Sequence, residues 1–147
     1  MAGVTLIELL LIITIVSVLT MVALPAYKSA REKLNIGDAT ADLMHISQQI
    51  TRYYADWKTW PSDLDAIGSN LTDPWGNDYQ YLNMALVQGH GLKRKDRNMV
   101  PLNTDYDLYS KGPDGESVNA LTAQQSKDDI IRAGNGQYLG IAEDYSF

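Results

Sequence analysis

The segment Val4–Leu24 reads VTLIELLLIITIVSVLTMVAL and contains a single charged residue, Glu8. A helix needs about 20 apolar residues to cross the hydrocarbon core of a bilayer, so this segment predicts a membrane span. A cleaved secretory signal and a buried helix of a soluble protein are the alternatives. A secretory signal has a basic start and a shorter apolar region, and here the apolar stretch continues into a helical pattern. We therefore expect a membrane anchor.

Glu8 is a carboxylate inside the predicted span. Such a group costs on the order of 2–3 kcal/mol in a bilayer and usually has both a partner and a function. The sequence from Met1 to Tyr27 contains no Lys, Arg or His. The partner of Glu8 is therefore expected to be another chain or a terminal amine, unless Glu8 is itself protonated.

Apolar residues continue in steps of three and four after Pro25, which predicts an amphipathic helix over residues 26–58. These positions are Tyr27, Ala30, Leu34, Ala39, Leu43, Ile46, Ile50, Tyr53 and Trp57. Pro25 removes a backbone hydrogen bond and is expected to bend the helix. Gly37 weakens its interior by roughly 1 kcal/mol relative to Ala. The expected helix runs from about Val4 to about Lys58, with residues 4–25 in lipid or against other chains and one stripe of the remainder against a head domain.

Residues 59–147 predict a small head rich in β-structure. Trp60-Pro61 breaks the helical pattern, and strands are expected at Tyr79–Tyr81, Tyr106–Ser110 and Gln137–Ala142. The predicted fold class is α+β, with one long N-terminal helix packed on a small antiparallel sheet. The chain has no Cys and therefore no disulfide. A head of this size is expected to gain stability in another way, for example from a metal ion or a partner subunit.

Charge and composition limit the function. The net charge is −6, from 18 acidic and 12 basic residues, which argues against binding to nucleic acid. The sequence shows no recognisable combination of a catalytic nucleophile with a general base, and no phosphate-binding loop. We therefore expect no enzymatic activity. The basic cluster Lys93–Arg97 is expected to be a solvated loop, and a contact to an acidic subunit or secreted partner is the alternative.

The N-terminal motif Gly3-Val4-Thr5-Leu6-Ile7-Glu8 resembles the class III signal of type IV pilins and pseudopilins. The resemblance implies that a prepilin peptidase removes a leader, residues 1–3, by cutting after Gly3 and methylates the new terminus at Val4. Counted from Val4, Glu8 is fifth and Pro25 is twenty-second, where the family has its acidic residue and its helix-kinking proline. In the family this glutamate pairs with the terminal amine of a neighbouring subunit.

Two features depart from this family pattern. The first mature residue is Val4, where the family usually has Phe or Met. The leader is short and lacks basic residues, while Lys28, Arg31 and Lys33 follow the span, so the positive-inside rule alone would reverse the orientation. We expect the true start to lie upstream.

The head carries a second resemblance. The runs DPWGNDYQY at Asp73–Tyr81 and YDLYSKGPDG at Tyr106–Gly115 resemble the major pseudopilin of type II secretion, whereas the segment 84–104 has no assignable counterpart. The resemblance implies a type IV pilin-like fold and a structural subunit of a pseudopilus that drives export of folded proteins across the outer membrane. A type IV pilus subunit for adhesion, motility or DNA uptake is the alternative, and a single-pass membrane receptor or sensor is a third interpretation.

The same resemblance implies the partners and the location. The partners would be further copies of the chain in a filament, minor pseudopilins, an inner-membrane assembly platform, the prepilin peptidase and the membrane. The subunit would sit in the inner membrane with its head in the periplasm before assembly, and in a periplasmic or extracellular filament afterwards.

An acidic, Gly-containing stretch near the C-terminus raises the possibility of a calcium site. Its acids are Asp114, Glu116, Asp128 and Asp129. Calcium prefers several oxygen ligands from flexible loops, but the spacing does not match an EF-hand, and such acids are usually solvated. The resemblance implies calcium held by Asp114, Asp129 and the backbone carbonyl of Lys111, with Asp128 and Glu116 as competing ligands.

Overall fold

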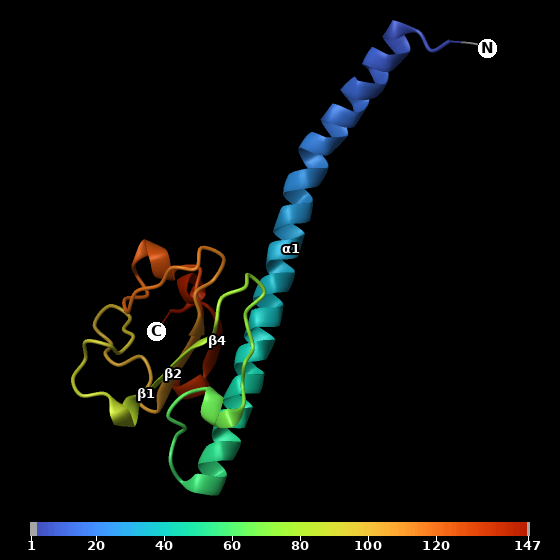
Figure 1. Ribbon diagram of the computed structural model, residues 1–147. Coiled ribbons are helices and arrows are strands. Elements are labelled where there is room, and N and C mark those ends of the chain that lie inside the picture. The colour runs from blue at the N-terminus through green and yellow to red at the C-terminus, as the bar shows by residue number, and fades with distance from the viewer. Residues whose placement is uncertain (1–2, 147) are drawn as a thin grey trace. The chain divides into compact units, whose positions relative to one another are not determined.

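The computed structural model describes residues 3–146, which fall into two compact units, 3–34 and 35–146. Met1 and Ala2 of the expected leader lie outside the described residues. The helix α1 spans Leu6–Trp57 and belongs to both units (Figure 1). It continues through Pro25 and Gly37 without interruption, close to the range predicted from the apolar periodicity.

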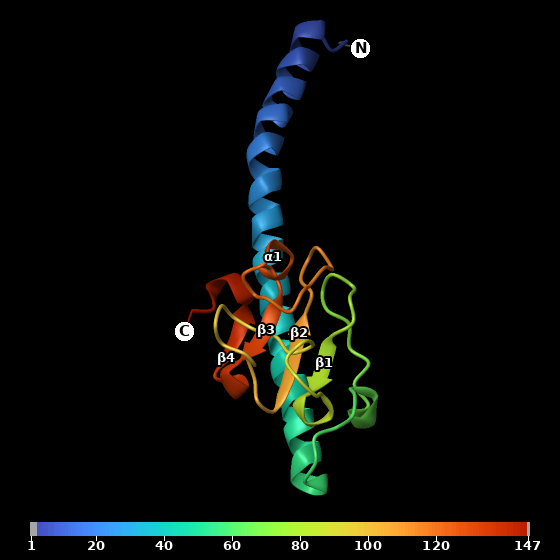
Figure 2. The same cartoon turned by 90° about the vertical axis from the view of Figure 1, so that its left-hand side faces the viewer.

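The second unit contains a four-stranded antiparallel sheet with the strand order β1-β2-β3-β4 (Figure 2). The strands are β1 (Gln80–Asn83), β2 (Tyr106–Ser110), β3 (Ile130–Ala133) and β4 (Tyr138–Ile141). A tight turn over Gly134–Gly136 joins β3 to β4. The predicted fold class, a long N-terminal helix packed on a small antiparallel sheet, is confirmed.

The main core lies between one face of the sheet and the second part of α1. Ala39, Leu43, Ile46 and Ile50, spaced four, three and four residues apart, are all fully buried. They pack with Tyr79, Tyr106, Leu108 and Ile130 from the sheet side. The periodicity predicted the correct helix face for these four positions, because 3.6 residues per turn bring them onto one side, whereas Tyr27, Leu34 and Trp57 of the same series are exposed.

The other face of the sheet is covered by segments without regular strands. Ile131 and Ala133 pack there with Leu102, Leu121 and Ala142. Leu102 comes from the chain between β1 and β2, and Leu121 from the chain between β2 and β3. Alternation along β2 serves both cores, since Tyr106 and Leu108 belong to the helix side and Tyr109 packs on the other side.

The strand β3 is absent from the sequence prediction. All four of its residues are buried, so the strand lacks the alternation of polar and apolar side chains that identifies a half-exposed strand. It directly follows Asp129, in the acidic stretch for which a calcium site is predicted. The strand predicted to follow the turn within Asp73–Tyr81 corresponds to β1, which begins at Gln80 and continues to Asn83.

Candidate functional site

The first unit presents an uninterrupted apolar surface. Every residue from 3 to 31 is exposed, including a long series of Leu, Ile and Val side chains. Within residues 3–146, α1 is the one helix long and apolar enough to cross a membrane, and none of its most apolar stretch is buried. A core helix of a soluble protein can have the same length and composition, but it is mostly buried. This surface therefore requires lipid or other chains as its environment.

The hydroxyl groups in this surface are satisfied within the helix. Thr14 donates to the carbonyl of Leu10 at 2.7 Å, and Ser17 donates to that of Ile13 at 2.6 Å. Thr20 makes the same kind of bond, to the residue four positions earlier, at 2.7 Å. Since no hydroxyl needs water, the segment can be placed in hydrocarbon at little cost.

Glu8 is held at the beginning of α1 by Thr5. Its Oε2 accepts hydrogen bonds from the backbone N–H and from the hydroxyl of Thr5, both at 2.8 Å. The Glu8 N–H donates in return to the Thr5 hydroxyl at 3.4 Å. This reciprocal arrangement is a capping box, and its signal, Thr followed three residues later by Glu, was overlooked in the sequence. Among the described residues no ion pair involves Glu8, so its charge is not neutralised within them.

The other three processing and assembly positions lie at the start of the chain and within α1. Gly3 and Val4 precede the helix and are exposed. Pro25 lies inside α1, where it cannot donate to the carbonyl of Met21. Cleavage after Gly3, methylation of Val4 and the pairing of Glu8 with a neighbouring subunit stay predictions.

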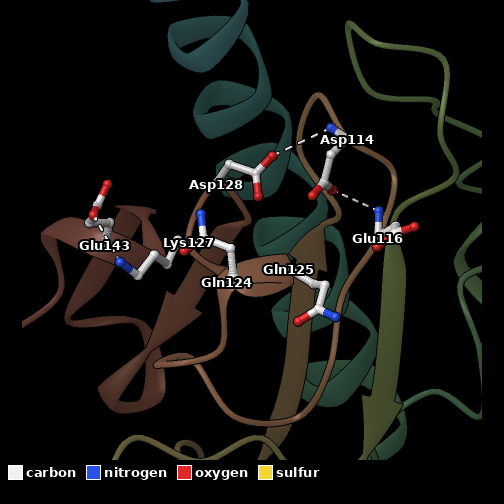
Figure 3. A pocket seen from close by; sticks show the side chains of 7 residues that line it. All are labelled: Asp114, Glu116, Gln124, Gln125, Lys127, Asp128 and Glu143. Atoms are coloured by element: carbon white, nitrogen blue, oxygen red, sulfur yellow. Dashed lines mark hydrogen bonds and ion pairs between the residues drawn. The ribbon is translucent and has the colours of Figure 1, made fainter.

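Asp114 and Asp128 of the predicted metal site lie close together. The N–H of Asp114 donates to Asp128 Oδ2 at 3.4 Å, and Asp114 Oδ1 accepts from the N–H of Glu116 at 2.8 Å. Burial raises the pKa of Asp128, and the nearby charge of Asp114 raises it further. Both acids line a pocket of about 540 Å³, shown in Figure 3. The other residues around it are Glu116, Gln124, Gln125, Lys127 and Glu143.

Lys111 follows β2 and leads into a close approach between two loops. Gly112, the next residue, has φ +65°, and a Cβ atom at this position would lie 2.3 Å from the backbone oxygen of Asp128. Glycine is therefore required here, because a side chain would overlap the facing backbone. The turn after Lys111 and the residues before β3 are in direct contact.

Asp129 has a different environment from Asp114 and Asp128. It is fully buried, and its Oδ2 lies 2.5 Å from Nη2 of Arg94 and 2.6 Å from the hydroxyl of Ser117. Burial raises its pKa to about 6, while the charge of Arg94 and the two hydrogen bonds act in the opposite direction. The expectation that the basic cluster 93–97 is solvated is thus wrong for Arg94, which is 2% exposed. The sequence offered no local signal for this pairing across 35 residues.

The predicted ligands fit a calcium ion only in part. The Asp114 N–H contacts the Asp128 carboxylate, and Asp129 Oδ1 is a buried oxygen with no hydrogen-bond partner in the described chain. Against this, Asp129 Oδ2 is occupied by Arg94. Within residues 3–146, no three side chains of His, Cys, Asp or Glu gather so that they could hold a metal ion. Calcium binding stays a prediction.

Comparison with known proteins places the chain in a family. It is 36% identical to the type IV major pilin protein PilE of Neisseria gonorrhoeae, with 89% of this chain and 81% of the pilin covered. It is 27% identical to the type II secretion system core protein G of Escherichia coli (strain K12), with 78% of this chain and 83% of that protein covered. The core protein G of Pseudomonas aeruginosa is also 27% identical, with 78% and 85% covered.

No family model matches the chain, and no solved structure matches it. The architecture, a long apolar N-terminal helix whose second part packs on a four-stranded antiparallel sheet, is the type IV pilin-like α+β fold that the resemblance implied. The chain belongs to the type IV pilin superfamily, as a relative of the core protein G pseudopilins of type II secretion and of the major pilins.

Proposed function

We propose that this chain is the repeating subunit of a type II secretion pseudopilus, the filament that drives folded proteins across the outer membrane. Its membership of the superfamily makes it a pilin-like filament subunit, and the proposal specifies which filament. The relatives named core protein G come from several bacteria, and the match to this chain covers 76–85% of their length. The absence of Cys agrees with this choice, since pilins commonly carry a C-terminal disulfide.

One observation carries the filament function: the exposed apolar surface of residues 6–24, which has no polar group left to bind water except Glu8. Lipid covers such a surface before assembly, and the equivalent helices of neighbouring subunits cover it afterwards. The same segment therefore serves as a membrane anchor and as the filament core. No catalytic residue is needed for either role.

Glu8 would set the axial position of each subunit. Thr5 occupies Oε2, and no hydrogen bond within residues 3–146 uses Oε1. Cleavage after Gly3 would create a positive amine at Val4, and methylation keeps that charge. Pairing of this amine with Glu8 of a neighbouring subunit brings opposite charges together in an apolar surrounding, where their attraction is strong. A subunit shifted along the axis would leave both charges unpaired.

This function requires specific partners and a defined location. A prepilin peptidase would process the chain, an inner-membrane assembly platform would extract it from the membrane, and minor pseudopilins would join the filament. The unassembled subunit would have its head in the periplasm.

The decisive first experiment is mass spectrometry of the N-terminus of the protein from cells that contain a prepilin peptidase. Cleavage after Gly3 with a methylated Val4 is expected. An N-terminus that retains residues before Val4 contradicts the filament function and favours a membrane receptor.

The second experiment separates a pseudopilus from a pilus. The chain is expressed in cells that lack their own core protein G, and a folded secreted protein is measured in the medium. Recovery of secretion supports the pseudopilus. The 36% identity to a major pilin over 89% of this chain favours the pilus as the second candidate. Surface pili and adhesion without recovery of secretion would establish that alternative.

A further inference from the structure

We propose that Arg94 performs in this chain the structural work that the family resemblance assigns to a calcium ion. The segment 84–104, here called the inserted segment, delivers the guanidinium group of Arg94 to the buried carboxylate of Asp129. It thereby fastens residues 111–129, here called the C-terminal loop, to the sheet. The head has no disulfide, and its loop is then held in place by the buried side chain of Arg94 rather than by a bound metal ion.

The contacts of the Arg94 side chain gather groups from two parts of the head. Nη2 lies 2.5 Å from Asp129 Oδ2, and Nη1 donates to the hydroxyl of Ser117 at 2.9 Å. On its flat face, the guanidinium carbon lies 3.9 Å from the ring centroid of Tyr109 in β2. A single buried cation thus joins two residues of the C-terminal loop to the outer face of the sheet. Arg suits this role because its planar group can bind an acid and stack on a ring together.

The backbone fixes the position of Arg94 independently of its side chain. Its N–H donates to Oδ2 of Asp107 in β2 at 3.1 Å, and its carbonyl accepts from the N–H of Leu102 at 2.8 Å. Asp107 is 1% exposed, so this anchor is itself buried. The backbone of Arg94 is therefore already fixed, which reduces the conformational entropy lost when the ion pair forms.

The inserted segment also binds the C-terminal loop directly through main-chain hydrogen bonds. The N–H of Lys95 donates to the carbonyl of Asn119 at 2.8 Å, and the N–H of Leu121 donates to the carbonyl of Lys95 at 3.0 Å. The Asn119 side chain donates to the carbonyl of Gly91 at 2.6 Å. The inserted segment has no counterpart in the family pattern. These contacts indicate that it orders the C-terminal loop, the loop for which the resemblance implies bound calcium.

Arg94 and calcium compete for the same acid. Calcium takes six to eight oxygen ligands, and Asp129 was one of two aspartates expected to supply them. A divalent ion bound to Asp129 would lie close to the guanidinium, and the two positive charges would repel each other. Asp114 and Asp128 remain at the pocket of Figure 3 together with Glu116 and Glu143, but within residues 3–146 no three acids gather closely enough to hold an ion.

Thermal unfolding of the full chain in detergent micelles tests this proposal. The three Trp residues, Trp57, Trp60 and Trp75, all lie in the second unit, so their fluorescence follows the head. The unmutated protein is expected to melt at the same temperature in millimolar calcium and in chelator. A rise in the melting temperature that grows with the calcium concentration would overturn the proposal, because an ion that binds only the folded form must stabilise it.

The variant Arg94→Gln is expected to lower the melting temperature by about 10 °C or more, because removal of one partner leaves a buried charge uncompensated. Lys95→Gln is the matched control, since it removes the same charge from the next residue, whose side chain is exposed. Equal melting of the two variants would contradict the role of Arg94.

The double variant Arg94→Gln/Asp129→Asn keeps the test valid even if the single variant does not fold. It removes both charges of the pair, so neither is left buried without its partner, and it is expected to recover most of the loss. A double variant that melts as low as Arg94→Gln, or that also fails to fold, would show that the loss does not arise from an unpaired Asp129.

Discussion

Asp73 connects the DPWG turn to the end of β2 through one buried carboxylate. Its Oδ1 accepts from the backbone N–H groups of Trp75 at 3.1 Å and Asn77 at 2.8 Å, which closes the turn. Its Oδ2 accepts from the hydroxyl of Ser110, the last residue of β2. Asp73 is 4% exposed, so water cannot easily replace these bonds. Asp73→Ala is therefore expected to destabilise the head strongly.

The expected loss follows from the number and type of these bonds. Hydrogen bonds to a charged group contribute about 1.5–3 kcal/mol each, so three at the lower value give roughly 4.5 kcal/mol. A change of 1 kcal/mol shifts the melting temperature of a domain of about 100 residues by roughly 4 °C. Asp73→Ala should then lower the melting temperature of the head by about 18 °C.

The measurement is tryptophan fluorescence during heating of the full chain in detergent. Asp78→Ala is the matched control, because it removes the same charge from an exposed position in the same run. We expect this control to melt within about 2 °C of the unmutated protein, as exposed substitutions usually change stability by less than 0.5 kcal/mol. If Asp73→Ala and Asp78→Ala melt at the same temperature, the turn is not held by the Asp73 carboxylate.

Three further outcomes are expected. Glu8→Val should leave membrane insertion intact or improved while the filament yield, counted by electron microscopy, falls at least tenfold, since the only charge in the span is lost; an unchanged yield would refute the pairing. Pro25 and Gly37 are expected to let the helix open locally in the filament, so Pro25→Ala with Gly37→Ala should slow hydrogen exchange around both positions, whereas strong uniform protection there in native filaments would contradict such local opening. Gly112→Ala should lower the melting temperature far more than Gly89→Ala, since both need positive φ but only Gly112 faces backbone at 2.3 Å, and similar effects of the two changes would refute this contact.

The part of the candidate site that the sequence could predict is the part built from neighbouring residues. Glu8 and Pro25 occupy a segment whose environment is set by its own composition, because about 20 apolar residues require lipid or other helices wherever they occur. Their roles in pairing and bending remain to be tested by the variants above. The Thr5–Glu8 capping box was equally local and could have been recognised from its spacing.

The acidic site shows where such prediction stops. Asp128 and Asp129 are adjacent in the chain, yet one lines an open pocket and the other is buried against Arg94. The acidic residues alone could not reveal this difference, because the partner comes from 35 residues earlier in the sequence. A basic side chain within a basic cluster is also predicted to be solvated unless its acidic partner is known.

The sequence by itself determined the apolar span, the buried face of α1 and the position of β2. These features repeat with the period of a helix or a strand, and such periods are set by local backbone geometry. Tertiary structure alone decided that Ile130–Ala133 forms a central strand and that Arg94 is a buried cation. Both depend on segments that meet only after folding, since β3 is completed by two neighbouring strands and Arg94 is buried by the loop and the sheet that it joins.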